Sequence, residues 1–218
     1  MIDRSTVAKH VEVEQDPVAR ARREAENGLK QAALAADIIR THIKDPERPF
    51  RLTQGILLQL HHAALEGLHP LAGTFRNVAN EIRGSQHRTA EVWQVADEVA
   101  HMCEYVTTQW QTQSPLHLSA YVMWRLNWIH PFVDGNGRTA RAVSYVVLNI
   151  KLDSLLPGSP AIPEIIDEDK DPYYAGLEAA DAAWKDDKRI DVSELEKVIG
   201  SALSKQLIRA AEEAEGRR

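Results

Sequence analysis

The chain has 218 residues, a net charge of −6 at neutral pH and a pI near 5.9. This length accommodates one domain with a sizeable core, and the acidic balance argues against a nucleic-acid binder, which concentrates lysine and arginine on one face. The sequence begins without an apolar signal segment, and no apolar run reaches the roughly 20 residues of a membrane span. We therefore expect a cytoplasmic protein with neither a nucleic-acid nor a membrane partner.

The first 50 residues are predicted to form a loose arm and one long helix. Residues 1–15 lack periodicity, whereas Asp16-Pro17 is typical of an N-cap followed by the first helical residue. Apolar residues then recur at helical spacing to about Ile43. We treat the region 1–50 as an N-terminal extension of the core that follows it.

The core, which we place at 51–190, begins with a helix, a loop and a short flap. Thr53 is a suitable N-cap for the helix. After the glycine-bounded loop at 67–73, helical periodicity fades, and Gly84-Ser85 is a turn signal. The sequence therefore predicts a small β-hairpin flap over residues 80–89.

Three helices are predicted in the middle of the chain. An amphipathic helix covers about 91–110. Ser114-Pro115 caps the next helix, which runs to residue 129, and another covers about 136–150. These last two are apolar on most sides, which predicts that they form the buried centre of the protein.

The C-terminal part is predicted to contain a proline-stiffened loop at 157–163 and two helices. An Asp-Pro pair at 171–172 begins a helix that carries Tyr174. Asp191, followed three residues later by a glutamate, is typical of the start of a final helix. We expect this helix, within 191–218, to pack on the core. The fold class is therefore all-α, a helical bundle with one small β-hairpin flap.

The stretch HPFVDGNGRTAR, residues 130–141, joins the two buried helices. Asp134 offers a hard oxygen ligand suited to Mg²⁺, and His130 is suited to accept a proton from a hydroxyl near neutral pH. The second helix directs its free N–H groups into the loop, and Arg138 and Arg141 share a face from which both can hold anionic oxygens. Each feature alone has a structural explanation, but their coincidence within twelve residues predicts an anion-binding, metal-assisted transfer site.

Nine positions of this stretch match the signature of the Fic family: His130, Pro131, Phe132, Asp134, Gly135, Asn136, Gly137, Arg138 and Arg141. The chain thus resembles a Fic-domain protein, most clearly over residues 55–185. Fic enzymes usually transfer AMP from ATP to a hydroxyl of a target protein. The resemblance implies the same helical bundle, with ATP and Mg²⁺ as cofactors.

The resemblance also implies roles for the residues of the loop. His130 would be the general base that deprotonates a Ser, Thr or Tyr of the target, and Asp134 would bind the Mg²⁺ that bridges the α- and β-phosphates. The backbone amides of Gly135 to Gly137, together with the Asn136 side chain, would form the anion hole for the α-phosphate.

Further residues receive roles in the same way. Arg138 would contact the β-phosphate and Arg141 the γ-phosphate of the nucleotide. Phe132 would pack into the core and fix the loop, and Tyr174 would line the adenine pocket.

The flap is the expected docking element for an unidentified target protein, because Fic domains lay the target against it as an added strand. Its candidate contacts to an acidic target segment or to the nucleotide are Arg83, Gln86, His87 and Arg88. The alternative for each of these residues is a solvated turn.

Two short segments of the chain match an inhibitory pattern in part. In many Fic proteins a helical glutamate followed by Gly or Asn pairs with the second motif arginine and blocks the γ-phosphate. Glu26-Asn27 matches this pattern in part, but Arg22 stands where Ser or Thr belongs; Glu215-Gly216 is a weaker match. We therefore consider Glu26 the candidate inhibitory residue, with an antitoxin chain, or no inhibition, as alternatives.

The sequence leaves other reactions open. A lysine at position 137 would resemble the Doc branch, whose members phosphorylate their targets, so Gly137 favours AMP transfer. Nothing in the loop recognises the base, and another nucleotide or a phosphocholine donor therefore stays possible. A catalytically silent nucleotide-binding module is the third alternative, although the intact His130 and Asp134 argue against it. A homo-oligomer is compatible with the sequence.

Overall fold

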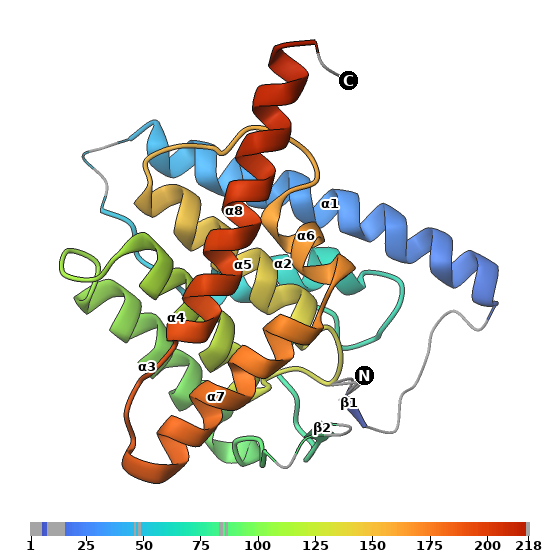
Figure 1. Ribbon diagram of the computed structural model, residues 1–218. Coiled ribbons are helices and arrows are strands. Elements are labelled where there is room, and N and C mark those ends of the chain that lie inside the picture. The colour runs from blue at the N-terminus through green and yellow to red at the C-terminus, as the bar shows by residue number, and fades with distance from the viewer. Residues whose placement is uncertain are drawn as a thin grey trace.

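The computed structural model describes residues 6–7, 16–45, 47, 49–82, 85 and 87–216. Within these residues the chain forms eight α-helices, one short 3₁₀ helix and two strands of two residues each (Figure 1). The predicted all-α fold is therefore confirmed. None of the described helices has the length and apolar character needed to cross a bilayer.

The structure contains every predicted helix and adds a strand at residues 6–7, a short 3₁₀ helix at 92–94 and a helix at 162–168. The bounds of the elements are β1 (Thr6–Val7), α1 (Pro17–Ile43), α2 (Gln54–Leu65), β2 (Glu81–Ile82), the 3₁₀ helix η1 (Val92–Gln94), α3 (Val95–Thr108), α4 (Pro115–Ile129), α5 (Asn136–Lys151), α6 (Ile162–Glu168), α7 (Asp171–Asp187) and α8 (Ser193–Ala214).

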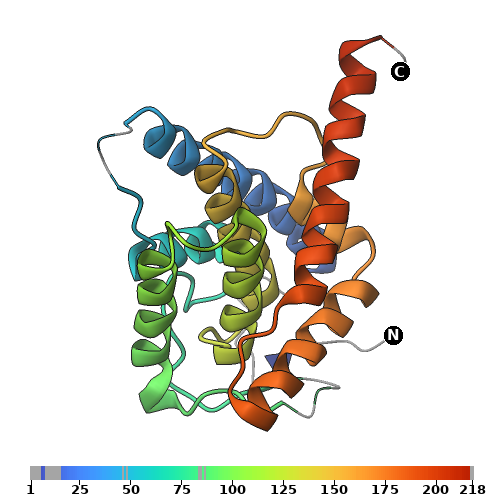
Figure 2. The same cartoon turned by 60° about the vertical axis from the view of Figure 1, so that its left-hand side comes forward.

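The apolar helices α4 and α5 form the centre of the bundle. α4 also packs against α3, α7 and α8, whereas α5 packs against α1, α2 and α6 (Figures 1 and 2). Two small side chains lie at the α4–α5 contact, where the hydroxyl oxygens of Ser119 and Ser144 are 2.7 Å apart. Large side chains such as Trp124 are completely buried on α4, each contributing about 1.5–3 kcal/mol through removal from water.

The ends of these two helices shape the loop between them. His130, the C-cap of α4, adopts a left-handed conformation with φ 53°, and Pro131 prevents continuation of the helix. Gly135 is the N-cap of α5 and is also left-handed, with φ 72°. A Cβ at Gly135 would lie 2.8 Å from Leu65 Cδ2, so both the backbone conformation and the close approach require glycine.

The flap differs from the predicted hairpin. β2 pairs in an antiparallel manner with β1, so that Thr6 lies opposite Ile82 and Val7 opposite Glu81. The described residues that follow in this segment, 85 and 87–89, form no strand. One edge of β2 is therefore occupied by residues 6–7 of the same chain, a non-local pairing that the local pattern cannot reveal.

The loop predicted at 157–163 is shorter than expected, because α6 begins at Ile162. The helix tolerates Pro163 because this residue lies in its first turn, where the backbone N–H has no intrahelical partner. Ile162 and Ile165 are buried, and α6 packs against α5 and α8. The helix thus places its acidic residues beside the loop at 130–141.

Candidate active site

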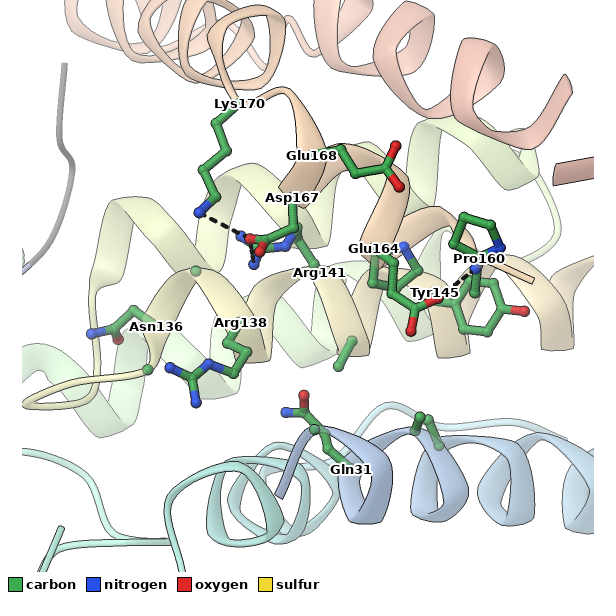
Figure 3. A pocket seen from close by; sticks show the side chains of 18 of the residues that line it. Gln31, Asn136, Arg138, Arg141, Tyr145, Pro160, Glu164, Asp167, Glu168 and Lys170 are labelled. Atoms are coloured by element: carbon green, nitrogen blue, oxygen red, sulfur yellow. Dashed lines mark hydrogen bonds and ion pairs between the residues drawn. The ribbon is translucent and has the colours of Figure 1, made fainter. Parts of the chain in front are cut away.

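The loop at 130–141 opens onto a cavity of about 1010 Å³ (Figure 3). Its wall is formed by α1, the loop, α5, the segment 158–161, α6 and the beginning of α7. The structure brings most of the predicted site residues together here, and the ones that line the cavity are His130, Asp134, Gly135, Asn136, Gly137, Arg138, Arg141 and Tyr174. Phe132 is completely buried beneath them.

His130 has a defined tautomer. Its side chain is buried among α4 and the loop, and Nδ1 lies 3.2 Å from the carbonyl oxygen of Asn127. A carbonyl only accepts hydrogen bonds, so Nδ1 carries the proton and Nε2 is the basic nitrogen of the ring. Asn127 is itself held by a 2.8 Å bond from its side-chain amide to the hydroxyl of Tyr173. The ring therefore has the orientation and tautomer that a general base needs.

The Asn136 side chain braces the loop. Its Oδ1 accepts a bond of 2.9 Å from the N–H of Phe132, and its Nδ2 donates a bond of 2.8 Å to the carbonyl of the same residue. Each end of the amide thus makes one bond within the protein, and these bonds fix the path of the loop. The amide nitrogen carries a second N–H, and the role of this side chain in the anion hole stays a prediction.

The first turn of α5 is the part of the site that is suited to an anion. Its N-cap, Gly135, provides no side chain to cap the helix, and the first N–H groups of a helix have no intrahelical partner. Gly137 lies inside α5 and has no positive φ, so it forms no bend. A Cβ there would lie 3.5 Å from Nη1 of Arg141. This is ordinary van der Waals contact, so a methyl group would fit there, and only a longer side chain would extend into the space beside Arg141.

The two motif arginines contact different neighbours. Nη1 of Arg138 is 3.4 Å from the carbonyl of Ala64 at the end of α2. Arg141 is nearly buried, and its Nη2 donates to the carboxylate of Asp167 on α6. Its guanidinium also lies 5.9 Å from the centre of the Tyr173 ring. The acid paired with Arg141 is therefore Asp167, a residue that the sequence did not indicate.

The predicted pair between Glu26 and Arg141 is absent from the structure. Glu26 instead accepts a 3.0 Å bond from Nε of Arg22 and lies 3.9 Å from Arg23, both on α1. Charges spaced three or four residues apart on one exposed helix face pair readily. Glu26 is not part of the cavity wall, so the prediction of an inhibitory Glu26 is not supported by these contacts.

The four flap candidates do not form one contact surface. Arg83 and Gln86 lie outside the described residues. His87 donates from Nε2 to the carbonyl of Trp128, at 2.8 Å, and so holds its segment against the end of α4. Arg88 is exposed, so its side chain stays available to a target.

Two residues that support the loop were missed as parts of the site. Arg76 is 3% exposed and bonds to the backbone of His130. His61, on α2, accepts a 2.9 Å bond from the N–H of Gly73 and donates from Nε2 to the carbonyl of Asp134, at 3.0 Å. The His61 ring also stacks on Phe132, with centroids 3.7 Å apart.

His61 predicts a loss of stability in acid. Burial lowers its pKa from 6.5 to about 4, so the unfolded chain binds the proton more readily than the folded chain between these pH values, and stability falls as the pH falls through them. We expect this residue to remove about 2 kcal/mol of unfolding free energy between pH 7 and pH 5. Chemical denaturation of the wild type and His61→Gln, which does not titrate there, tests this. An equal loss in both proteins would contradict it.

Comparisons with known proteins agree with this architecture. The sequence model of the Fic/DOC family matches residues 51–148. A Fic-1 fragment from C. elegans has a TM-score of 0.67 at 18% identity, covering 91% of this chain and 53% of that chain. A Fic-domain signalling protein from Bacteroides thetaiotaomicron has a TM-score of 0.62 at 20% identity, with coverage of 87% and 72%. The present chain thus spans about half of the C. elegans fragment, and likeness at these identities concerns the fold.

A third similar structure contains a nucleotide analogue. BepC from Bartonella tribocorum, determined with bound AMPPNP, has a TM-score of 0.53 at 13% identity and covers 87% of this chain and 88% of that chain. The bound molecule is a property of BepC.

Proposed function

Residues 51–148 of this chain are a Fic/DOC family domain, and on that premise we propose that the protein transfers AMP from ATP to a hydroxyl of a target protein. One observation carries this proposal: His130, with its basic nitrogen fixed as Nε2, lines the same cavity as the uncapped N-terminus of α5 and the two arginines. A base and an anion-binding surface in one cavity are what transfer to a hydroxyl requires.

The triphosphate is bound by the first turn of α5 and by the arginines. Free N–H groups at a helix N-terminus hold phosphate oxygens through the helix dipole and direct hydrogen bonds. Arg138 and Arg141 follow on the same helix at successive positions along the cavity. We assign the α-phosphate to the helix terminus, the β-phosphate to Arg138 and the γ-phosphate to Arg141. The AMPPNP in BepC supports a nucleotide donor of this kind.

In the reaction, the hydroxyl oxygen of the target forms a bond with the α-phosphorus, and the bond from that phosphorus to pyrophosphate breaks. Nε2 of His130 accepts the hydroxyl proton, and pyrophosphate leaves toward the arginines. Such transfers depend mainly on positioning and on stabilisation of charge. The bonds of the loop to Asn136 and His61 hold the base and the helix terminus in position before the substrates bind.

Asp134 is the residue that would hold Mg²⁺. Its half-buried carboxylate lines the cavity, and Oδ1 accepts a 2.6 Å bond from the N–H of Gly135. A site with one carboxylate fits this ion, because Mg²⁺ usually binds one or two protein carboxylates and takes further oxygens from phosphates and water. When bound there, Mg²⁺ would neutralise phosphate charge.

Gly137 favours transfer of AMP over transfer of the terminal phosphate. Because a Cβ at this position would approach Arg141, a longer side chain would enter the space assigned to the terminal phosphate. The glycine leaves that space to the donor, so the α-phosphate can rest at the helix terminus with the other two phosphates extending toward the arginines.

The proposal predicts which phosphate labels protein. Incubation with Mg²⁺ and ATP labelled at the α-phosphate is expected to leave label on the chain itself or on an added protein acceptor from a cell extract, whereas label at the γ-phosphate should be released. Gel separation of the products followed by autoradiography measures both. Transfer from the γ-phosphate alone would overturn the proposal in favour of a kinase.

A further inference from the structure

The carboxylate of Asp167 is shared by two cations in the wall of the cavity. Nη2 of the nearly buried Arg141 donates to its Oδ1, and Nζ of Lys170 lies 3.1 Å from the same oxygen. Figure 3 shows Asp167 directly over Arg141, with Lys170 reaching toward the pair from the same side. All three residues line the cavity. Arg141 is thus paired with an acid before any donor binds.

Asp167 is ionised at neutral pH. Burial acts to raise the pKa of this carboxyl, but the attraction of Arg141 and the hydrogen bond from Lys170 outweigh burial, so the pKa lies below its usual value. The positive charge of Arg141 is therefore largely balanced within the protein. An incoming anion gains less from this arginine than from one without a partner.

The other end of the same guanidinium faces the first turn of α5, beside the space assigned to the phosphates of the donor. Nη1 of Arg141 would be 3.5 Å from a Cβ at Gly137, in the first turn of α5. A terminal phosphate beside Nη1 and the carboxylate of Asp167 on Nη2 would then be held by one planar group. Two anions held by one guanidinium repel each other, and the repulsion is stronger in a partly dry cavity than in water.

We propose that Asp167 selects among phosphate donors, because its carboxylate competes with the terminal phosphate of a nucleoside triphosphate for Arg141 and Lys170. The proposal rests on the proposed function, since it assigns the terminal phosphate to Arg141. Asp167 therefore weakens the binding of triphosphates and has little effect on diphosphates, whose last phosphate is at Arg138. Asp167 occupies Arg141 in the way expected of Glu26, but from α6 rather than α1.

Asp167→Asn tests the competition with little change in shape. With Mg²⁺ present, calorimetry on the full chain would measure binding of AMPPNP and of ADP to the wild type and the variant. We expect AMPPNP to bind the variant roughly tenfold more tightly, the size of a typical coupling between sites, and ADP to change by less than about twofold. If Asp167 instead served to orient Arg141, AMPPNP would bind the variant more weakly, and the proposal would be overturned.

Two matched variants separate local competition from a general effect of charge. Glu168→Gln removes the same charge from a neighbouring residue of the cavity wall that points away from Arg141 (Figure 3), and Glu26→Gln removes it from α1. Tighter binding of AMPPNP to Asp167→Asn alone supports the proposal, whereas equally tighter binding to all three variants overturns it. Binding of neither nucleotide to any of the proteins, with unfolding temperatures unchanged, would reject the nucleotide site and thus the proposed function itself.

Discussion

His130→Ala is expected to reduce transfer of label from the α-phosphate to protein by about 100-fold or more, the usual contribution of a general base. The reason is the tautomer: Nδ1 is bonded to the carbonyl of Asn127, which leaves Nε2 to accept the hydroxyl proton in the cavity. Single-turnover measurement of α-phosphate transfer gives the rate directly. Binding of AMPPNP should change by less than about twofold, because the phosphates are assigned to α5 and its arginines.

The backbone at His130 requires a second variant. With φ 53° the residue is left-handed, a conformation that costs alanine roughly 1–2 kcal/mol. His130→Asn is the matched control, because asparagine tolerates this conformation and lacks the imidazole. We expect the Asn variant to be as inactive as the Ala variant but closer to wild type in unfolding temperature. Retention of substantial α-phosphate transfer by a folded His130→Asn protein would show that another group removes the proton.

The centre of the fold could be predicted because the signals that determine it are local. Ser114 and Pro115 lie directly at the start of α4, and Pro131 and Gly135 bound the loop at its end. The apolar character of both helices is equally visible in the residues themselves. The nine motif positions lie within twelve consecutive residues, so their assembly around the loop needs no knowledge of distant contacts.

What the sequence could not reveal depends on contacts between distant residues. The prolines at 157, 160 and 163 suggested a loop over 157–163, because a proline inside a helix is usually disruptive. Pro163 is tolerated in α6 because it lies in the first turn. Because the sequence did not predict α6, it also did not indicate Asp167 as the partner of Arg141. The pairing of β1 with β2 is likewise non-local. For Arg141 and for β2, the deciding partner lies far away in the chain.

The support of the loop by Arg76 is another non-local feature, and it leads to a prediction with a large effect on stability. Its guanidinium donates to three carbonyls: that of His130 at 2.8 Å from Nε, that of Val78 at 3.0 Å from Nη1, and that of Ala90 from Nη2. The backbone N–H of Arg76 also donates to the carbonyl of Pro131, at 2.8 Å. The segment before β2 is thereby attached to the start of the motif loop.

Arg76→Ala is expected to lower the unfolding free energy by about 3 kcal/mol, because buried carbonyls lose charge-assisted hydrogen bonds. For a chain of this size the unfolding temperature should fall by about 6–12 °C, which scanning calorimetry measures. Arg88→Ala, at an exposed position of the same segment, is the control and should unfold within about 2 °C of wild type. Unfolding of Arg76→Ala at the wild-type temperature would mean that the three bonds contribute nothing.

Arg76→Lys distinguishes a role in positioning His130 from a role in stability alone. Lysine keeps the positive charge, but its single ammonium cannot reproduce the planar fork that reaches three carbonyls at once. Arg76 bonds to the backbone of His130 and does not line the cavity. A folded Arg76→Lys protein should therefore lose roughly tenfold in the rate of α-phosphate transfer. Its affinity for AMPPNP should change by less than about twofold. A parallel loss of rate and affinity would place the effect on the whole loop, whereas loss of rate alone would assign Arg76 to the orientation of the base.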